Sequence, residues 1–109
     1  MEDRRVFARI NARFPVRFLD PTRGKEGSAD TVDISANGLG LITNDNLAAR
    51  TPLEMWLDIP DQHEHLYTRG EVAWSQTLPD TGQQRLGIRL EKAELMGLAR
   101  VLWMKQKAG

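Results

Sequence analysis

Three segments of the chain alternate hydrophobic and polar residues, which is the pattern of a β-strand with one buried and one exposed face. The residues expected to face the core are Phe14, Val16 and Phe18; Leu53, Met55, Leu57 and Ile59; and Leu86, Ile88 and Leu90. Residues typical of turns lie between these segments, at Asp20-Pro21, Gly24 to Gly27, Asn37-Gly38, Thr51-Pro52, Pro60-Asp61 and Pro79 to Gly82. Short strands at this spacing predict an all-β fold, an antiparallel β-barrel.

The hydrophobic period changes near the C-terminal end. Apolar residues recur there at helical spacing, at Leu95, Leu98, Ala99 and Leu102. Lysines close to the end of this segment complement the helix dipole, whereas Gly97 disfavours a helix interior by about 1 kcal/mol relative to alanine. We therefore predict a single domain with three parts: a flexible arginine-rich arm at 1–12, an antiparallel β-barrel at 13–91 and a C-terminal helix at 92–109.

Composition narrows the class of protein. A chain of 109 residues with 40% hydrophobic content is long enough for one core and too short for two typical domains. The sequence has no cysteine, which excludes a disulfide scaffold and any metal site built on thiolates. It has no apolar run as long as a membrane span, and its charged N-terminal end is unlike a signal peptide. We expect a cytoplasmic protein without membrane insertion.

The charge is balanced overall but unevenly distributed. The formal net charge is zero, yet residues 1–25 hold seven basic against three acidic side chains. A site for a long polyanion needs many phosphate contacts spread over one face, so a local basic segment on a neutral body suits a small anion better. We therefore expect no binding of DNA or RNA. A solvated, partly disordered N-terminal segment is the alternative interpretation.

Arg5 and Arg9 form the first candidate motif. They are four residues apart, and side chains at this spacing point to one side in both a helix and a strand. Their planar guanidinium groups can pair bidentately with a phosphate or with the O6 and N7 acceptors of guanine. The spacing is common in basic segments, so surface charge without a ligand is the alternative.

Asp33 and Ser35 form the second candidate motif. If Val32 and Ile34 face the core of a strand, Asp33 and Ser35 point outward on the same side. A carboxylate can accept hydrogen bonds from the N1 and N2 donors of guanine, and a hydroxyl can donate to a phosphate. Gly38 leaves room for the close approach of a ligand. The alternative is a hairpin in which Asp33 and Ser35 only cap the turn.

Four segments of this chain closely resemble the PilZ domain, a bacterial receptor for cyclic di-GMP. They are residues 4–9 (RRVFAR), 33–38 (DISANG), 69–74 (RGEVAW) and 85–90 (RLGIRL). The signature motifs of that family, Arg-x-x-x-Arg followed by Asp/Asn-x-Ser-x-x-Gly, match at Arg5, Arg9, Asp33, Ser35 and Gly38. The resemblance covers nearly the whole chain. It implies a six-stranded antiparallel barrel with a C-terminal helix, and an arginine arm that closes over the bound ligand.

The resemblance adds further candidates for ligand binding. An arginine at the position of Arg4 accompanies, in similar proteins, binding of a stacked dimer of the ligand instead of a monomer. Asn37 lies within the second motif, and Trp74 could stack on a guanine, with a place in the barrel core as its alternative. Arg13 and Arg89 are outward basic residues that no motif places.

The function that the resemblance implies is that of a receptor or adaptor and not of an enzyme. Cyclic di-GMP is the expected ligand, with no cofactor, and binding would order the arm and change the surface shown to a downstream protein partner. Motility, biofilm formation and other processes are all compatible with the resemblance. The chain would be a monomer or a weak homodimer.

Three other functions remain open from the residues alone. An enzyme or zinc site could use only His63 and His65, although a solvated charge cluster fits that polar segment better. A PilZ-like protein–protein interaction module that does not bind nucleotide is the second alternative. The third is a barrel that binds single-stranded nucleic acid, for which exposed aromatic residues beside basic ones are expected.

Overall fold

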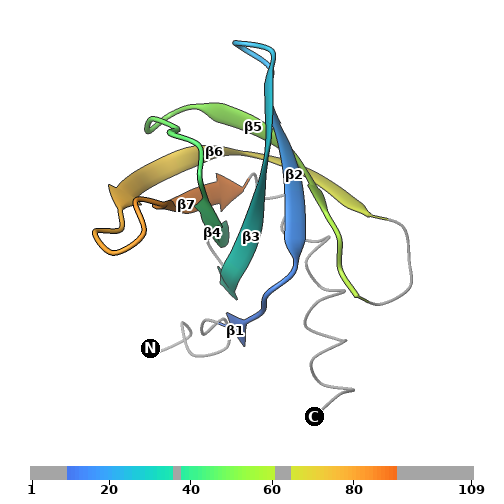
Figure 1. Cartoon of the computed structure of the whole chain (residues 1–109). Coiled ribbons are helices and arrows are strands. Elements are labelled where there is room, and N and C mark those ends of the chain that lie inside the picture. The colour runs from blue at the N-terminus through green and yellow to red at the C-terminus, as the bar shows by residue number, and fades with distance from the viewer. Residues whose placement is uncertain (1–9, 36–37, 61–64, 91–109) are drawn as a thin grey trace, which may run out of the picture.

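The computed structural model describes residues 10–35, 38–60 and 65–90, and every regular element within them is a β-strand (Figure 1). The strands are β1 (Ile10–Asn11), β2 (Pro15–Asp20), β3 (Lys25–Ser35), β4 (Gly38–Thr43), β5 (Pro52–Leu57), β6 (Leu66–Thr77) and β7 (Gln84–Leu90). Residues 1–9 of the predicted arm and the predicted helix at 92–109 lie outside the described residues. No helix that could span a lipid bilayer occurs in the part that the structure describes.

Six of these strands form a closed antiparallel barrel. They pair in the order β3-β2-β5-β6-β7-β4, and β4 pairs in turn with β3, which completes the ring. β1 pairs with the end of β3 that β2 leaves uncovered, and Figure 1 shows it beside that end. The predicted antiparallel barrel is therefore confirmed.

The barrel interior is filled by the residues that the alternating pattern selects. All ten side chains predicted to face the core are buried. Each aliphatic or phenylalanine side chain in such a core contributes roughly 1.5–3 kcal/mol relative to an exposed one. Five further buried side chains, which lie on strands without a clear alternation, extend the cluster on its β3, β4 and β6 sides: Ala29, Ile34, Leu39, Leu41 and Val72.

Thr31 fixes the connection between β1 and β2 against β3. Its buried hydroxyl donates a hydrogen bond to the carbonyl of Ala12 and accepts one from the backbone N–H of Phe14, at 2.9 Å. The N–H of Thr31 donates to the Phe14 carbonyl at 3.0 Å. Residues 12–14 thus have defined partners on β3, although the alternating pattern alone assigns this segment no strand neighbour.

Two strands each contain one extra residue that changes the side from which the following side chains project. On β3 the register shifts between Thr31 and Asp33, which leaves Val32 as the extra residue. On β6 it shifts between Val72 and Trp74, which leaves Ala73 as the extra residue. A β-bulge of this kind breaks the two-residue period. Val32 is only half-buried, so the expectation that it faces the core is wrong, while Ile34 is buried as expected.

Gly38 lets β4 approach β7 closely. A Cβ atom at this position would lie 1.8 Å from the carbonyl oxygen of Ile88, a backbone atom that a small rotation cannot move away. Its φ of +147° is also a conformation that residues with a side chain rarely adopt. Any side chain here would push apart two strands that close the barrel.

We expect Gly38→Ala to lower the free energy of unfolding by about 2–5 kcal/mol, since it combines overpacking with backbone strain. Gly82→Ala is the matched control, because Gly82 has a φ of +77° but open space around its Cβ position. Gly82→Ala should lower the free energy of unfolding only by the cost of a left-handed backbone conformation, about 1–2 kcal/mol. Urea unfolding of both variants measures the difference, and equal losses would contradict the steric explanation.

Candidate functional site

Strands β3, β4, β7 and β6 present three rows of paired residues on the outside of the barrel. The residues between these rows, such as Leu41 and Ile88, are buried in the core, so the rows themselves face outward. In strand order the rows are Asp30, Ile42, Arg85 and Gln76; Asp33, Gly40, Gly87 and Trp74; and Ser35, Gly38, Arg89 and Glu71. Glycines occupy the middle of the second row and the β4 position of the third. These glycines form a low floor, over which the side chains of neighbouring strands can lie.

Asp33 lies against this floor and has an arginine partner. A Cβ atom at Gly40 would lie 2.5 Å from Asp33 Oδ1, so the carboxylate occupies the space that a side chain on β4 would need. Asp33 Oδ2 is 3.3 Å from Nη2 of Arg85 on β7. Only 11% of the Asp33 side chain is exposed, yet it lies on the outer face and not in the hydrophobic core. The predicted outward orientation of Asp33 holds, because the extra residue at Val32 precedes it.

Trp74 forms the opposite wall of the same row. It is 45% exposed, and a Cβ atom at Gly87 would lie 2.3 Å from its indole nitrogen, so the ring covers Gly87. The alternative in which Trp74 belongs to the barrel core is wrong. The extra residue at Ala73 turns its side chain to the face opposite that of Val72.

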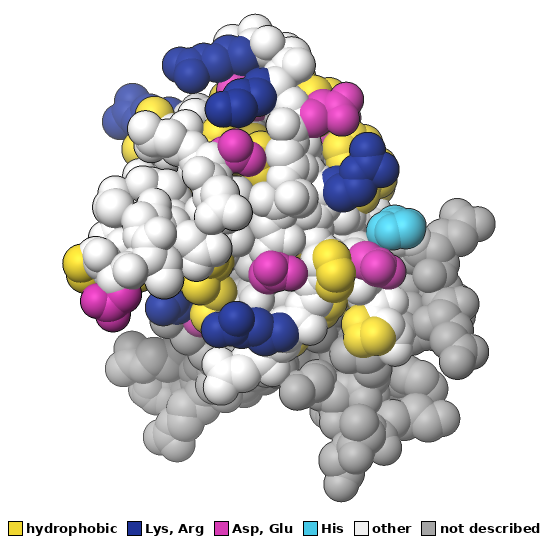
Figure 2. Space-filling view, viewed as in Figure 1, with side chains coloured by type: hydrophobic (Ala, Val, Ile, Leu, Met, Phe, Trp, Pro, Cys, Tyr) yellow, Lys and Arg dark blue, Asp and Glu magenta, His cyan; other side chains and the backbone are white. Residues whose placement is uncertain are grey.

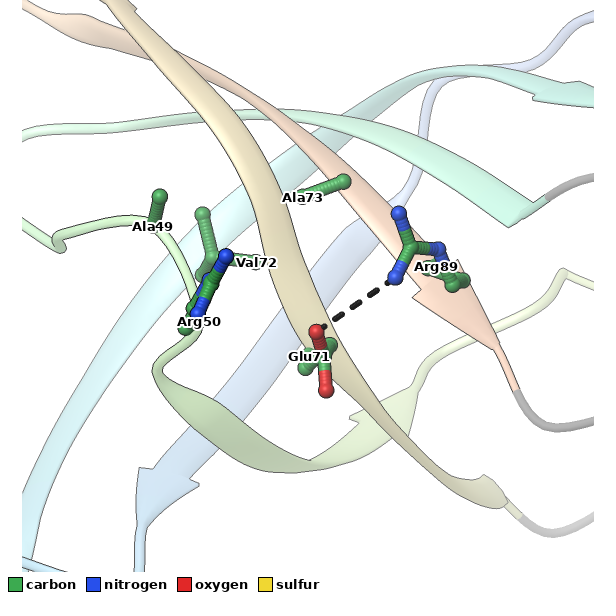
Figure 3. Close-up of a pocket in the computed structure, with 6 residues that line it drawn as sticks. All are labelled: Ala49, Arg50, Glu71, Val72, Ala73 and Arg89. Atoms are coloured by element: carbon green, nitrogen blue, oxygen red, sulfur yellow. Dashed lines mark ion pairs between the residues drawn. The ribbon is translucent and has the colours of Figure 1, made fainter.

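The third row adds a hydroxyl and a second ion pair. Half-buried Ser35 lies opposite Gly38. Arg89 Nη1 is 3.5 Å from Glu71 Oε2, and both side chains are well exposed. Figure 3 shows the two pointing toward each other beside a hollow that Ala49, Arg50, Val72 and Ala73 also line. The guanidinium of Arg89 therefore points toward Glu71 on β6 and away from Ser35 on β3.

Four further candidates, Arg4, Arg5, Arg9 and Asn37, lie outside the described residues. The structure does place the backbone next to Arg9. Ile10 pairs with Ile34 and Asn11 pairs with Asp33, so the chain reaches the second motif at the residue that follows Arg9 in the sequence. The barrel therefore brings the residues that follow Arg9 next to the second motif, although 22 positions separate Asn11 from Asp33 in the numbering.

The other candidates of the sequence show no feature of a binding or metal site among the described residues. Arg13 is exposed, and the exposed His65 has its Nε2 3.8 Å from Asp58 Oδ1; His63 lies outside the described residues. Among residues 10–35, 38–60 and 65–90, no group of three or more His, Cys, Asp and Glu residues is placed to hold a metal ion. On the face of the described part shown in Figure 2, basic and acidic side chains are interspersed and form no extended patch of one sign.

Arg85 is the residue that the sequence analysis missed. It matches neither signature motif, and 52 positions separate it from Asp33. Its contact with Asp33 depends on the order β3-β4-β7, in which the side chain reaches across β4. In the sequence, the only indication of its outward direction is that Arg85 occupies a polar position in the alternating segment that contains Leu86 and Ile88.

Comparison with known proteins identifies relatives of this fold. The family model described as PilZ domain matches residues 3–104. The inhibitor of motility MotI/DgrA from Bacillus subtilis has a TM-score of 0.72 at 18% identity, covering 98% of this chain and 53% of that protein. The PilZ domain of YcgR from Escherichia coli, solved with c-di-GMP, has a TM-score of 0.71 at 14% identity, covering 98% and 95%.

The MrkH–c-di-GMP complex from K. pneumonia has a TM-score of 0.65 at 14% identity, covering 98% of this chain and 55% of that protein. The chain thus spans about half the length of MotI and of MrkH. At these low identities the TM-scores establish a shared fold. A search of curated protein sequences finds no significant match.

The contact between Trp74 and Gly87 gives a direct test of the site's geometry. We expect Gly87→Ala to displace the indole, which would change the near-ultraviolet circular dichroism and lower the free energy of unfolding by about 1–3 kcal/mol. In a Trp74→Ala background no ring remains to be displaced, so Gly87→Ala should leave the free energy of unfolding nearly unchanged. Equal costs in both backgrounds, measured as a double-mutant cycle, would contradict the placement of the ring over Gly87.

Proposed function

The chain belongs to the PilZ domain family, and on that premise we propose that it is a receptor for cyclic di-GMP that signals to a partner protein. Two structures of similar fold contain c-di-GMP, that of the PilZ domain of YcgR and that of MrkH. This supports the ligand class, and the side chains of this chain support the mode of binding. The proposed role is regulatory and not catalytic.

The observation on which the proposal rests is the pairing of β1 with the second motif. Asn11 lies opposite Asp33, and Arg9 is only two residues before Asn11 in the sequence. Because an extended chain spans about 3.3–3.6 Å per residue, Arg5 can reach at most about 18 Å from Ile10. We propose that Arg5 and Arg9 pair with the phosphates or the guanine acceptors of a ligand bound at Asp33 and Ser35.

Each group at the proposed site has a chemical counterpart on the ligand. The carboxylate of Asp33 would accept hydrogen bonds from N1–H and N2–H of a guanine, and the hydroxyl of Ser35 would donate to a phosphate. We assign Gly38 to the same site on the match to the second motif. The exposed ring of Trp74 would stack on a base. We assign Arg4 and Asn37 to the same site on the match to the motifs.

Binding would act as a switch by changing the position of the arm. Ordering a segment has an entropic cost, so it can shift the equilibrium only if the ligand binds the closed state more tightly than the open one. Several arginines in one short segment repel each other, and the ligand's two phosphates would remove that repulsion. The partner protein would then recognise the surface formed by the ordered arm.

We expect cyclic di-GMP to raise the melting temperature of the protein, because a ligand that binds only the folded state stabilises it. At a concentration 100-fold above the dissociation constant the gain is about 2.7 kcal/mol, or about 10 °C for a domain of this size. Thermal denaturation with GTP at the same concentration is the control. An unchanged melting temperature would instead favour an interaction module that binds no nucleotide.

We further expect Arg5→Ala and Arg9→Ala each to weaken binding of cyclic di-GMP by about 10- to 100-fold, because each removes a charge-assisted contact. The folded barrel and its melting temperature without ligand should be unchanged. Arg17→Ala is the matched control, since Arg17 is an exposed arginine on β2 whose ion pair with Glu26 is at 3.9 Å. Calorimetric titration gives the affinity and the number of ligands bound, and equal affinities in all three variants would exclude the arm.

A further inference from the structure

The ion pair between Asp33 and Arg85 crosses an intervening strand. Arg85 lies opposite Ile42 and Asp33 lies opposite Gly40, so the guanidinium reaches diagonally over β4 to the carboxylate. The absence of a side chain at Gly40 keeps this path open, since any Cβ there would collide with Asp33. The two groups therefore form one polar edge above the glycine floor.

Arg85 has donors that this pair does not use. Its Nη2 lies 3.3 Å from Asp33 Oδ2, longer than the 2.7–2.9 Å typical of a charge-assisted hydrogen bond. Its buried Nε–H has no hydrogen-bond partner among the residues that the structure describes. A buried N–H without an acceptor is unfavourable, and the guanidinium holds five N–H donors in a rigid plane. One third of the side chain is exposed, so a ligand can approach the side chain although it cannot reach the buried Nε.

The order of hydrogen-bond donors and acceptors along this edge is complementary to that of one base, guanine. The two oxygens of Asp33 are acceptors, and the guanidinium next to them is a donor. Cytosine presents the same sequence of two acceptors and one donor when it pairs with guanine, whose N2–H and N1–H donors are followed by the O6 acceptor. Adenine presents an amino donor where guanine has O6, so the guanidinium would meet a donor instead of an acceptor.

We propose that Arg85 determines specificity for guanine: it donates a hydrogen bond to O6 of the same base whose N1–H and N2–H are bound by Asp33. This inference rests on the proposed binding of cyclic di-GMP at Asp33. In the free protein the guanidinium holds the carboxylate in place across β4. In the complex it keeps its position beside Asp33 and donates to the base from a guanidinium nitrogen other than the buried Nε.

The test compares Arg85→Met with the wild type in calorimetric titrations with cyclic di-GMP and with cyclic di-AMP. Methionine keeps an unbranched apolar stem but has no donor, so affinity for cyclic di-GMP should fall about 10- to 100-fold. Affinity for cyclic di-AMP should not fall, so the preference for guanine over adenine shrinks by the same factor. A role confined to positioning Asp33 is separated from this one in an Asp33→Ala background: there Arg85→Met should still lower the preference for guanine, whereas an Arg85 that acts only through Asp33 would leave that preference unchanged.

Arg17→Met is the matched control, because it removes one positive charge from β2, three strands away from β7 in either direction around the barrel. It should leave both affinities unchanged. If Arg85→Met does not fold, Arg85→Lys replaces it, since lysine keeps the charge beside Asp33 but loses the planar fork. It should lower the preference for guanine about 5-fold or more.

The outcomes separate this inference from the proposed function. Wild-type protein that binds cyclic di-GMP, together with Arg85 variants of unchanged guanine preference, would overturn the role of Arg85 and leave the receptor function standing. Wild-type protein that binds no cyclic di-GMP would overturn the receptor function and the role of Arg85 with it.

Discussion

The outer surface of this barrel depends on two positions at which a strand contains one residue more than its partner. In a regular strand, Thr31 and Asp33 would project from the same side, and so would Val72 and Trp74. The extra residues Val32 and Ala73 reverse the second member of each pair. As a result Thr31 and Val72 fill the interior, while a carboxylate and an indole stand at opposite ends of one outward row.

The sequence predicted the parts of the fold that obey a simple period. β2, β5 and β7 alternate apolar and polar residues, and their buried residues are those expected. β3 could not be recognised in this way, because its first residues are polar, its core position at Thr31 is a hydroxyl and its period breaks at Val32. The outward direction of Asp33 was predicted correctly, but from the wrong premise that Val32 faces the core.

The candidate site could be predicted only as far as its motifs extend. Asp33, Ser35 and Gly38 are recognisable because they lie within six consecutive positions. The role of Arg85 depends on strand order, since β4 must lie between β3 and β7 for the side chain to reach Asp33. No short-range pattern encodes that order. Trp74 is visible in the sequence as an aromatic residue, but its face is set by a bulge that no local signal announces.

The glycine of the second motif and its two polar residues satisfy different requirements. The close contact of Gly38 with the Ile88 carbonyl belongs to barrel closure and would be needed in a homologue that binds nothing. Asp33 and Ser35 project outward, so neither is a steric requirement of the pairing between β4 and β7. If the proposed function is correct, retention of the glycine in related proteins reports that the barrel is intact, whereas retention of the aspartate and the serine reports that the ligand is still recognised. A family member that keeps only the glycine is then expected to fold as a barrel without binding the ligand.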